Sequence, residues 1–69
     1  LEYMLLKNFE QALPYLERAV KLKPDDPMAQ YNLAITYINL NDNYSAREVL
    51  KVLQQLDRNL ADRLSRLIK

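Results

Sequence analysis

Apolar residues recur every three or four positions along the whole chain, which is the spacing of one helix face. The recurring positions are Ala12, Leu16, Ala19 and Val20; Leu33, Ile35, Tyr37 and Ile38; Val49, Leu50, Leu53 and Leu56; and Leu60, Leu64, Leu67 and Ile68. No stretch alternates for long between apolar and polar residues, as a half-buried strand would. The pattern therefore predicts an all-α protein with helices near residues 1–6, 9–22, 27–40, 44–56 and 60–68.

Short polar residues mark the starts of these helices. Three pairs have the spacing of a helix N-cap: Asn8 with Gln11, Asp26 with Pro27, and Asn59 with Asp62. The remaining start falls in Asn41-Asp42-Asn43, in a chain that has no Gly. We expect an Asn there to take the left-handed conformation that usually needs Gly, with Asp or Asn capping the helix that follows.

The chain resembles itself at one fixed offset, with position i matching position i+34. The matching pairs are Tyr3 and Tyr37, Leu6 and Leu40, Ala12 and Ala46, Leu16 and Leu50, Leu22 and Leu56, and Leu33 and Leu67. A period of this length covers two antiparallel helices, which together present an apolar face that they cannot cover alone. We therefore expect neighbouring helix pairs to stack.

Phe9-x2-Ala12-x3-Leu16-x2-Ala19-x4-Pro24, followed by Tyr31-Asn32-Leu33-Ala34-x2-Tyr37, resembles the tetratricopeptide repeat, a helix-turn-helix unit with the same period. The resemblance covers the whole chain and implies an α-solenoid of antiparallel helix pairs. It places the end of one repeat at 1–26, a complete repeat at 27–60 and a terminal solvating helix at 61–69. The small alanines would let the helix backbones approach closely.

The second repeat departs from the family pattern at four positions. Ala34 stands where Gly is usual, Leu53 where Ala is usual, Asn43 where an aromatic residue is usual, and Arg58 where the closing Pro is expected. We expect Leu53 to change the angle of the last helix slightly. Pro14 lies inside a predicted helix, where proline costs about 3 kcal/mol in an ideal interior. The resemblance implies that this outward-facing proline is tolerated with a slight bend.

The last predicted helix has one apolar and one polar face. Its apolar stripe consists of Leu60, Leu64, Leu67 and Ile68, and the polar face of Asp62, Arg63, Arg66 and Lys69. A helix that ends a stack needs one face to pack and one to stay in water. We therefore interpret it as a capping helix.

The composition excludes most enzyme chemistry. The 69 residues include no His, no Cys and no Gly, and therefore lack the base of most nucleophile pairs, the usual transition-metal ligands and any glycine-rich phosphate loop. We expect no catalytic residue, no metal and no cofactor. The longest uncharged stretch, 27–41, is interrupted by polar side chains, so we expect no membrane insertion. Because the chain starts at Leu1 without a leader, we expect it to be part of a longer polypeptide.

In tetratricopeptide repeats the first helix of each pair lines a concave groove. The resemblance places on this inner surface Met28, Tyr31, Asn32, Ile35, Ile38, Asn39 and Arg66. Aromatic and aliphatic side chains with scattered amides and one Arg suit an extended peptide or an amphipathic helix. The resemblance thus implies a non-catalytic scaffold that binds a protein partner.

Some members of this family bind a C-terminal carboxylate with a clamp of Lys, Asn and Arg side chains. Asn32 and Arg66 fall on two of the clamp positions, but Asp62 occupies a Lys position and Leu1 an Asn position. An Asp repels a carboxylate where the clamp needs a cation. We therefore do not expect carboxylate capture.

The first predicted helix suggests a second function. Leu1, Met4, Leu5 and Leu6 crowd a segment too short to be a stable helix by itself. Exposed apolar patches of this kind mark interfaces. The alternative function is therefore a structural module that forms homo-oligomers through these residues.

Charge gives little reason to expect a nucleic acid or lipid partner. Ten Lys and Arg against nine Asp and Glu give a net charge of +1. Residues 58–69 carry +3, from four cations less Asp62, and 25–57 carry −3, from five acids less Arg47 and Lys51. The basic end lacks interleaved aromatic residues, so we expect no nucleic-acid contact. Without cysteine, the sequence leaves the cellular compartment open.

Overall fold

The computed structural model describes residues 9–68 and, within them, helices joined by short turns. The helices are α2 (Phe9–Leu22), α3 (Pro27–Asn39), α4 (Asn43–Leu56) and α5 (Arg58–Leu67). No strand occurs in this part of the chain, which confirms the all-α class. The helix expected at 1–6, the proposed cap Asn8 and the terminal Lys69 lie outside the described residues.

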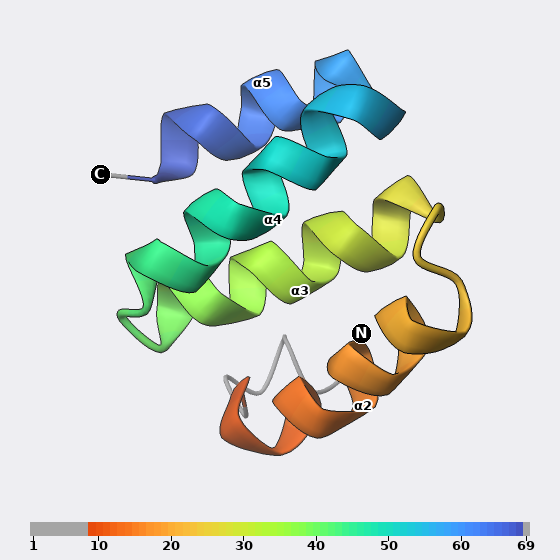
Figure 1. Cartoon of the computed structure of the whole chain (residues 1–69). Helices are drawn as coiled ribbons and strands as arrows, with labels where there is room; N and C mark the ends of the chain where they lie inside the picture. The colour runs from red at the N-terminus through yellow and green to blue at the C-terminus, as the bar shows by residue number, and fades with distance from the viewer. Residues whose placement is uncertain (1–8, 69) are drawn as a thin grey trace.

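Successive helices run antiparallel and lie side by side, as Figure 1 shows. Helix α3 contacts α2, α4 and α5, and α4 also contacts α5. The helix pairs therefore stack as the repeat offset predicts. Helix α3 occupies the centre of the stack, with α2 and α5 as the outer helices of the described part.

An aspartate begins each of the last three helices. The Oδ1 atoms of Asp26, Asp42 and Asp57 accept hydrogen bonds from the backbone N–H of Met28 at 3.0 Å, Ser45 at 3.1 Å and Leu60 at 3.2 Å, respectively. The predicted cap at Asp26 is thereby confirmed. The prediction that Asn59 caps the last helix is wrong, because Asp57 takes that place and α5 begins at Arg58.

Helix α5 begins early because Arg58 stands where the family pattern has a proline. In the first joint Pro24 disfavours helical geometry for the residue before it, and the segment 23–26 separates the two helices. In the second joint Arg58 stands at the equivalent position, and only Asp57 separates α4 from α5. The Asp57 N–H donates to the Leu53 carbonyl at 2.8 Å, and its own carbonyl accepts from the Ala61 N–H at 2.9 Å. Asp57 therefore ends one helix and begins the next.

The turn between α3 and α4 depends on an asparagine in place of glycine. Asn41 has a φ of 63°, in the left-handed region, as expected from the sequence. The N–H of Asn41 donates to the Ile38 carbonyl at 3.0 Å, and that of Asp42 to the Tyr37 carbonyl at 2.8 Å. This pair of bonds is the Schellman pattern, which satisfies the last carbonyls of α3 and reverses the chain.

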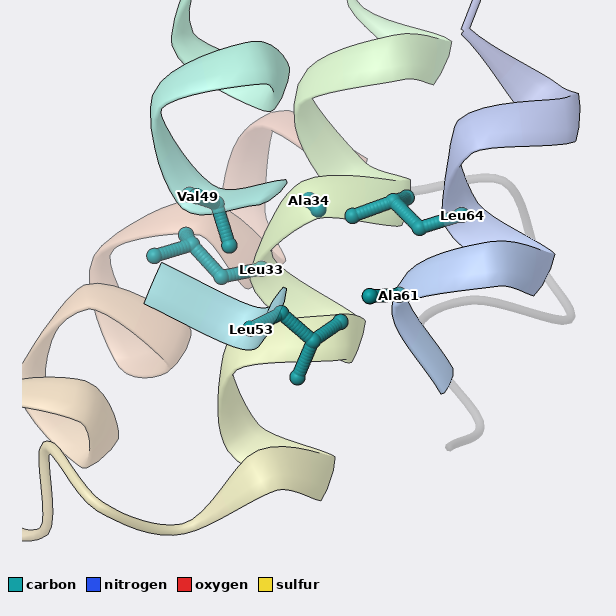
Figure 2. Close-up of a cluster of buried hydrophobic side chains, with 6 residues drawn as sticks. All are labelled: Leu33, Ala34, Val49, Leu53, Ala61 and Leu64. Carbon is teal, nitrogen blue, oxygen red and sulfur yellow. The ribbon is translucent and has the colours of Figure 1, made fainter. Parts of the chain in front are cut away.

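The hydrophobic core surrounds the middle of α3. Its buried members are Leu33, Ala34, Val49, Leu53, Ala61 and Leu64 (Figure 2). In this view Leu64 extends from α5 toward Ala34, while Leu33 lies beside Val49 of α4. Fully burying one leucine side chain contributes about 1.5–3 kcal/mol. The core therefore fastens α4 and α5 to the same central helix.

The core accommodates the departures from the family pattern. Ala34 is fully buried, and its single methyl group lets Leu64 approach the α3 backbone. Leu53 is also fully buried, in the same cluster as the small Ala61. Pro14 lies on an exposed side of α2, and the helix continues on both sides of it.

The stripe of the last helix is covered only in part. Leu64 is fully buried, and Leu60 and Ile68 are partly buried against the core. Leu67 is exposed, contrary to the expectation that the whole stripe packs. In the described part of the molecule no helix lies over Leu67 as α4 lies over its counterpart, Leu33.

Candidate binding surface

Six of the seven residues expected in the groove belong to α3, and the seventh, Arg66, belongs to α5. Three of them, Tyr31, Ile35 and Ile38, are spaced four and three residues apart and therefore share one stripe of α3. All three are partly buried and pack against the hydrophobic core. The structure thus brings them together as a stripe held from beneath by the core, with part of each side chain accessible. We call Tyr31, Ile35 and Ile38 the α3 stripe.

The remaining α3 residues extend the surface toward both ends of the helix. Met28, in the first turn, is exposed and contributes an apolar side chain. Asn39, in the last turn, is exposed and donates from Nδ2 to the Ile35 carbonyl at 2.9 Å. Asn32 is partly buried, and its backbone carbonyl accepts from Thr36 Oγ1 at 3.0 Å. The Asn39 side chain is therefore bonded to its own helix, whereas the bond at Asn32 involves only its backbone carbonyl.

Arg66 is exposed on α5, which contacts α3 directly. The cation thus belongs to the helix next to the α3 stripe. Asp62, one turn earlier on α5, is exposed as well. Because Asp62 and Arg66 are four residues apart, the exposed surface of α5 carries both a negative and a positive charge.

Two depressions occur elsewhere in the described part of the molecule. One of about 470 Å³ is lined by Pro14, Glu17, Arg18 and Lys21 of α2, with Leu33 of α3. Another of about 440 Å³ is lined by Gln54, Arg58, Ala61 and Asp62, where α4 meets α5. None of the expected groove residues lines either one. Neither depression was predicted from the sequence, although the α2 residues of the first, Pro14, Glu17, Arg18 and Lys21, have the spacing of one helix face.

A hydrogen bond between helices borders the first depression. The Tyr37 hydroxyl on α3 donates to Glu17 Oε2 on α2 at 3.1 Å. Burial raises the pKa of Tyr37, and the hydrogen bond and the negative charges of Glu17 and Asp42 raise it further. This contact joins two repeats and so has a structural role.

The buried polar side chains also have structural partners. Gln30 is buried, and its Nε2 donates to the Pro24 carbonyl at 2.9 Å, which ties α3 to the preceding turn. Among the described residues, no buried side-chain nitrogen or oxygen lacks a hydrogen-bond partner. No group of carboxylates with the arrangement of a metal site occurs within 9–68. No helix in that range is long and apolar enough to cross a membrane.

The family comparison agrees with this arrangement. The model of the tetratricopeptide repeat matches residues 3–68. The chain belongs to the tetratricopeptide repeat family. Its helix pairs are therefore tetratricopeptide repeats by sequence as well as by architecture, and such repeats are in general protein-interaction modules.

A curated relative shares part of this tetratricopeptide repeat sequence. The human (Homo sapiens) "Protein O-mannosyl-transferase TMTC3" is 42% identical over 50 residues, which are 72% of this chain and 6% of that protein. The chain thus corresponds to a small part of that relative. No solved structure matches the chain.

The second set of predicted site residues lies outside the described part of the chain. Leu1, Met4, Leu5 and Leu6 were the residues expected to mediate self-association. That expectation therefore stays a prediction.

Proposed function

We propose that this tetratricopeptide repeat chain is a non-catalytic module that binds a peptide or helix of a partner protein along the α3 stripe. The observation that carries the proposal is that Tyr31, Ile35 and Ile38 pack against the core on one side and remain partly accessible on the other. Because these three side chains already pack against the core, their rotamers are restricted before a partner binds. Most of the ordering cost of binding would then fall on the partner.

The surroundings of the stripe indicate the chemistry of the partner. Met28 extends the apolar surface at one end of α3, and Asn39 adds an amide at the other. Arg66 on the adjacent helix offers a charge-assisted hydrogen bond to an acidic side chain. Asp62, one turn away on α5, disfavours a second acidic group. The surface therefore suits an apolar segment with one acidic residue at its edge.

The test is selection of peptides from a random display library on the 69-residue chain, followed by calorimetry with a selected peptide. We expect Tyr31→Ala combined with Ile35→Ala to abolish binding, because both supply the stripe. These residues also support the core, so the exposed pair Met28→Ala with Arg66→Ala serves as a second variant that keeps the core intact. It should weaken binding about tenfold, the equivalent of 1.4 kcal/mol.

The matched control is Tyr44→Ala, which removes an exposed tyrosine from α4. Its binding should equal that of the unchanged chain, and circular dichroism should show equal helicity for Tyr44→Ala and for the combined Met28→Ala and Arg66→Ala variant. Undiminished affinity in both the Tyr31/Ile35 and the Met28/Arg66 double variants would reject binding along the α3 stripe.

A further inference from the structure

The larger of the two depressions lies between α2 and α3 and has a volume of about 470 Å³. Its lining residues, which we call the α2 depression, are Pro14, Glu17, Arg18, Lys21 and Leu33. Leu33 is two residues from Tyr31 and from Ile35, which is about 200° around a helix. The α2 depression therefore lies on the opposite side of α3 from the α3 stripe.

The α2 depression holds two cations that have no carboxylate partner among the described residues. Arg18 and Lys21 are both exposed, and neither forms an ion pair or a side-chain hydrogen bond with another residue of 9–68. Glu17 has the spacing of a helix ion pair with Lys21, yet its Oε2 accepts from the Tyr37 hydroxyl at 3.1 Å instead. The two cationic groups are therefore accessible to a carboxylate from another molecule.

The equivalent face of the second repeat is built differently. At the repeat offset, the four lining positions of α2 become Glu48, Lys51, Val52 and Gln55. There Lys51 Nζ lies 3.1 Å from Glu48 Oε2, so the one cation of this set pairs with the one anion. Two cations without an ion-pair partner are thus particular to α2, and stacking of the repeats does not require them.

The lining of the α2 depression suits a carboxylate that lies beside an apolar side chain. The Arg18 guanidinium can donate two hydrogen bonds to one carboxylate, and Lys21, one turn further along α2, adds a second cation. Pro14, one turn before Arg18, offers an apolar ring, and Leu33 forms part of the wall. Glu17 repels groups of high negative charge, so a single carboxylate fits better than a polyanion.

We propose that the α2 depression binds an acidic segment of a partner protein. An aspartate or glutamate carboxylate of this segment pairs with Arg18 and Lys21, and a neighbouring apolar side chain packs on the Pro14 ring. The site shares no residue with the α3 stripe, so the two surfaces can bind different segments. The inference does not depend on the function proposed for the stripe.

The experiment is an NMR titration of the 69-residue chain with a blocked tetrapeptide of alternating leucine and aspartate residues. The matched probe carries asparagine in place of each aspartate. We expect the aspartate peptide to cause saturable shifts at the Arg18 Nε–H and the Leu33 methyl groups, and the asparagine peptide to cause none. No saturable shift up to about 10 mM peptide, or equal shifts with both peptides, would overturn the proposal.

The variant that tests the site is Arg18→Gln combined with Lys21→Gln, which removes both charges and keeps two helix-favouring side chains. Both residues are exposed, so helicity by circular dichroism should be unchanged, while the affinity should fall about tenfold or more. The matched control is Lys51→Gln with Arg63→Gln, which removes two exposed cations elsewhere and should change the affinity less than about twofold. Equal losses in the two double variants would indicate attraction to net charge alone and would overturn the site.

Two further measurements separate this site from other occupants and from the α3 stripe. The Met28→Ala with Arg66→Ala variant, which should weaken binding along the stripe, should bind the aspartate peptide with unchanged affinity. Loss of binding in that variant would place the peptide on the stripe and overturn the proposal. A single-stranded oligonucleotide that causes the same shifts at lower concentration than the peptide would assign the depression to a polyanion, and would overturn it as well.

Discussion

Single side-chain hydrogen bonds hold neighbouring helices and turns of this molecule in register. Gln30 reaches from α3 to the Pro24 carbonyl, and Tyr37 reaches from α3 to Glu17 on α2. The first bond lies in a buried setting, where loss of one partner leaves a polar group unsatisfied at a cost of about 1–3 kcal/mol. The second is more accessible and contributes less. Its loss is nonetheless measurable, because it can be removed without changing the ring of Tyr37.

We expect Tyr37→Phe to destabilise the chain by about 0.5–1 kcal/mol at neutral pH, since it deletes one accessible hydrogen bond and keeps the aromatic packing. The folded chain raises the pKa of Tyr37, so this residue stabilises the fold below the unfolded pKa, and the contribution is lost as pH rises through the higher folded pKa. The difference in unfolding free energy between the unchanged chain and Tyr37→Phe should therefore shrink above about pH 10. Urea titrations at several pH values measure it. A difference that grows with pH would contradict the assigned contact.

At the scale of helices, local signals decide most boundaries. Asp26 before Pro27 and the asparagine at 41 were predictable from the sequence, because each acts through its own backbone and its immediate neighbours. The start of α5 was not, because both Asp57 and Asn59 are acceptable caps. Because Arg58 stands where the family pattern has a proline, Asp57 is the cap and α5 begins at the next residue.

The cap of α5 gives a direct comparison between the two candidates. Asp57→Ala should cost about 1 kcal/mol, because it removes the acceptor for the Leu60 N–H. Asn59→Ala should stay within about 0.5 kcal/mol, because Asn59 is an exposed residue inside the helix. Thermal or urea unfolding of the two variants measures both effects. A larger loss for Asn59→Ala would restore the sequence-based assignment.

For the whole molecule, the repeat offset was sufficient to predict the stacking of helix pairs, whereas the expectation that α3 carries the candidate stripe came from the family resemblance. The offset could not predict exposure, because exposure depends on which neighbours lie over a residue. Leu33 and Leu67 occupy the same position in the repeat, yet one is buried and the other is accessible. The same reason explains why the depression beside Pro14 was not predicted, since one of its lining residues, Leu33, belongs to another helix.

The stack also sets how stability is distributed along the chain. A domain of this size has a total stability of about 3–10 kcal/mol, and Leu64 fastens α5 by filling the space beside Ala34. Leu64→Ala should cost about 2–5 kcal/mol, whereas Leu67→Ala should cost far less because Leu67 is already exposed. Native-state hydrogen exchange should show α5 amides losing protection first in Leu64→Ala, with α3 the most protected because it contacts three helices. Equal losses in the two leucine variants would mean that α5 is not held through Leu64, and the central position of α3 would then not explain the stability of the stack.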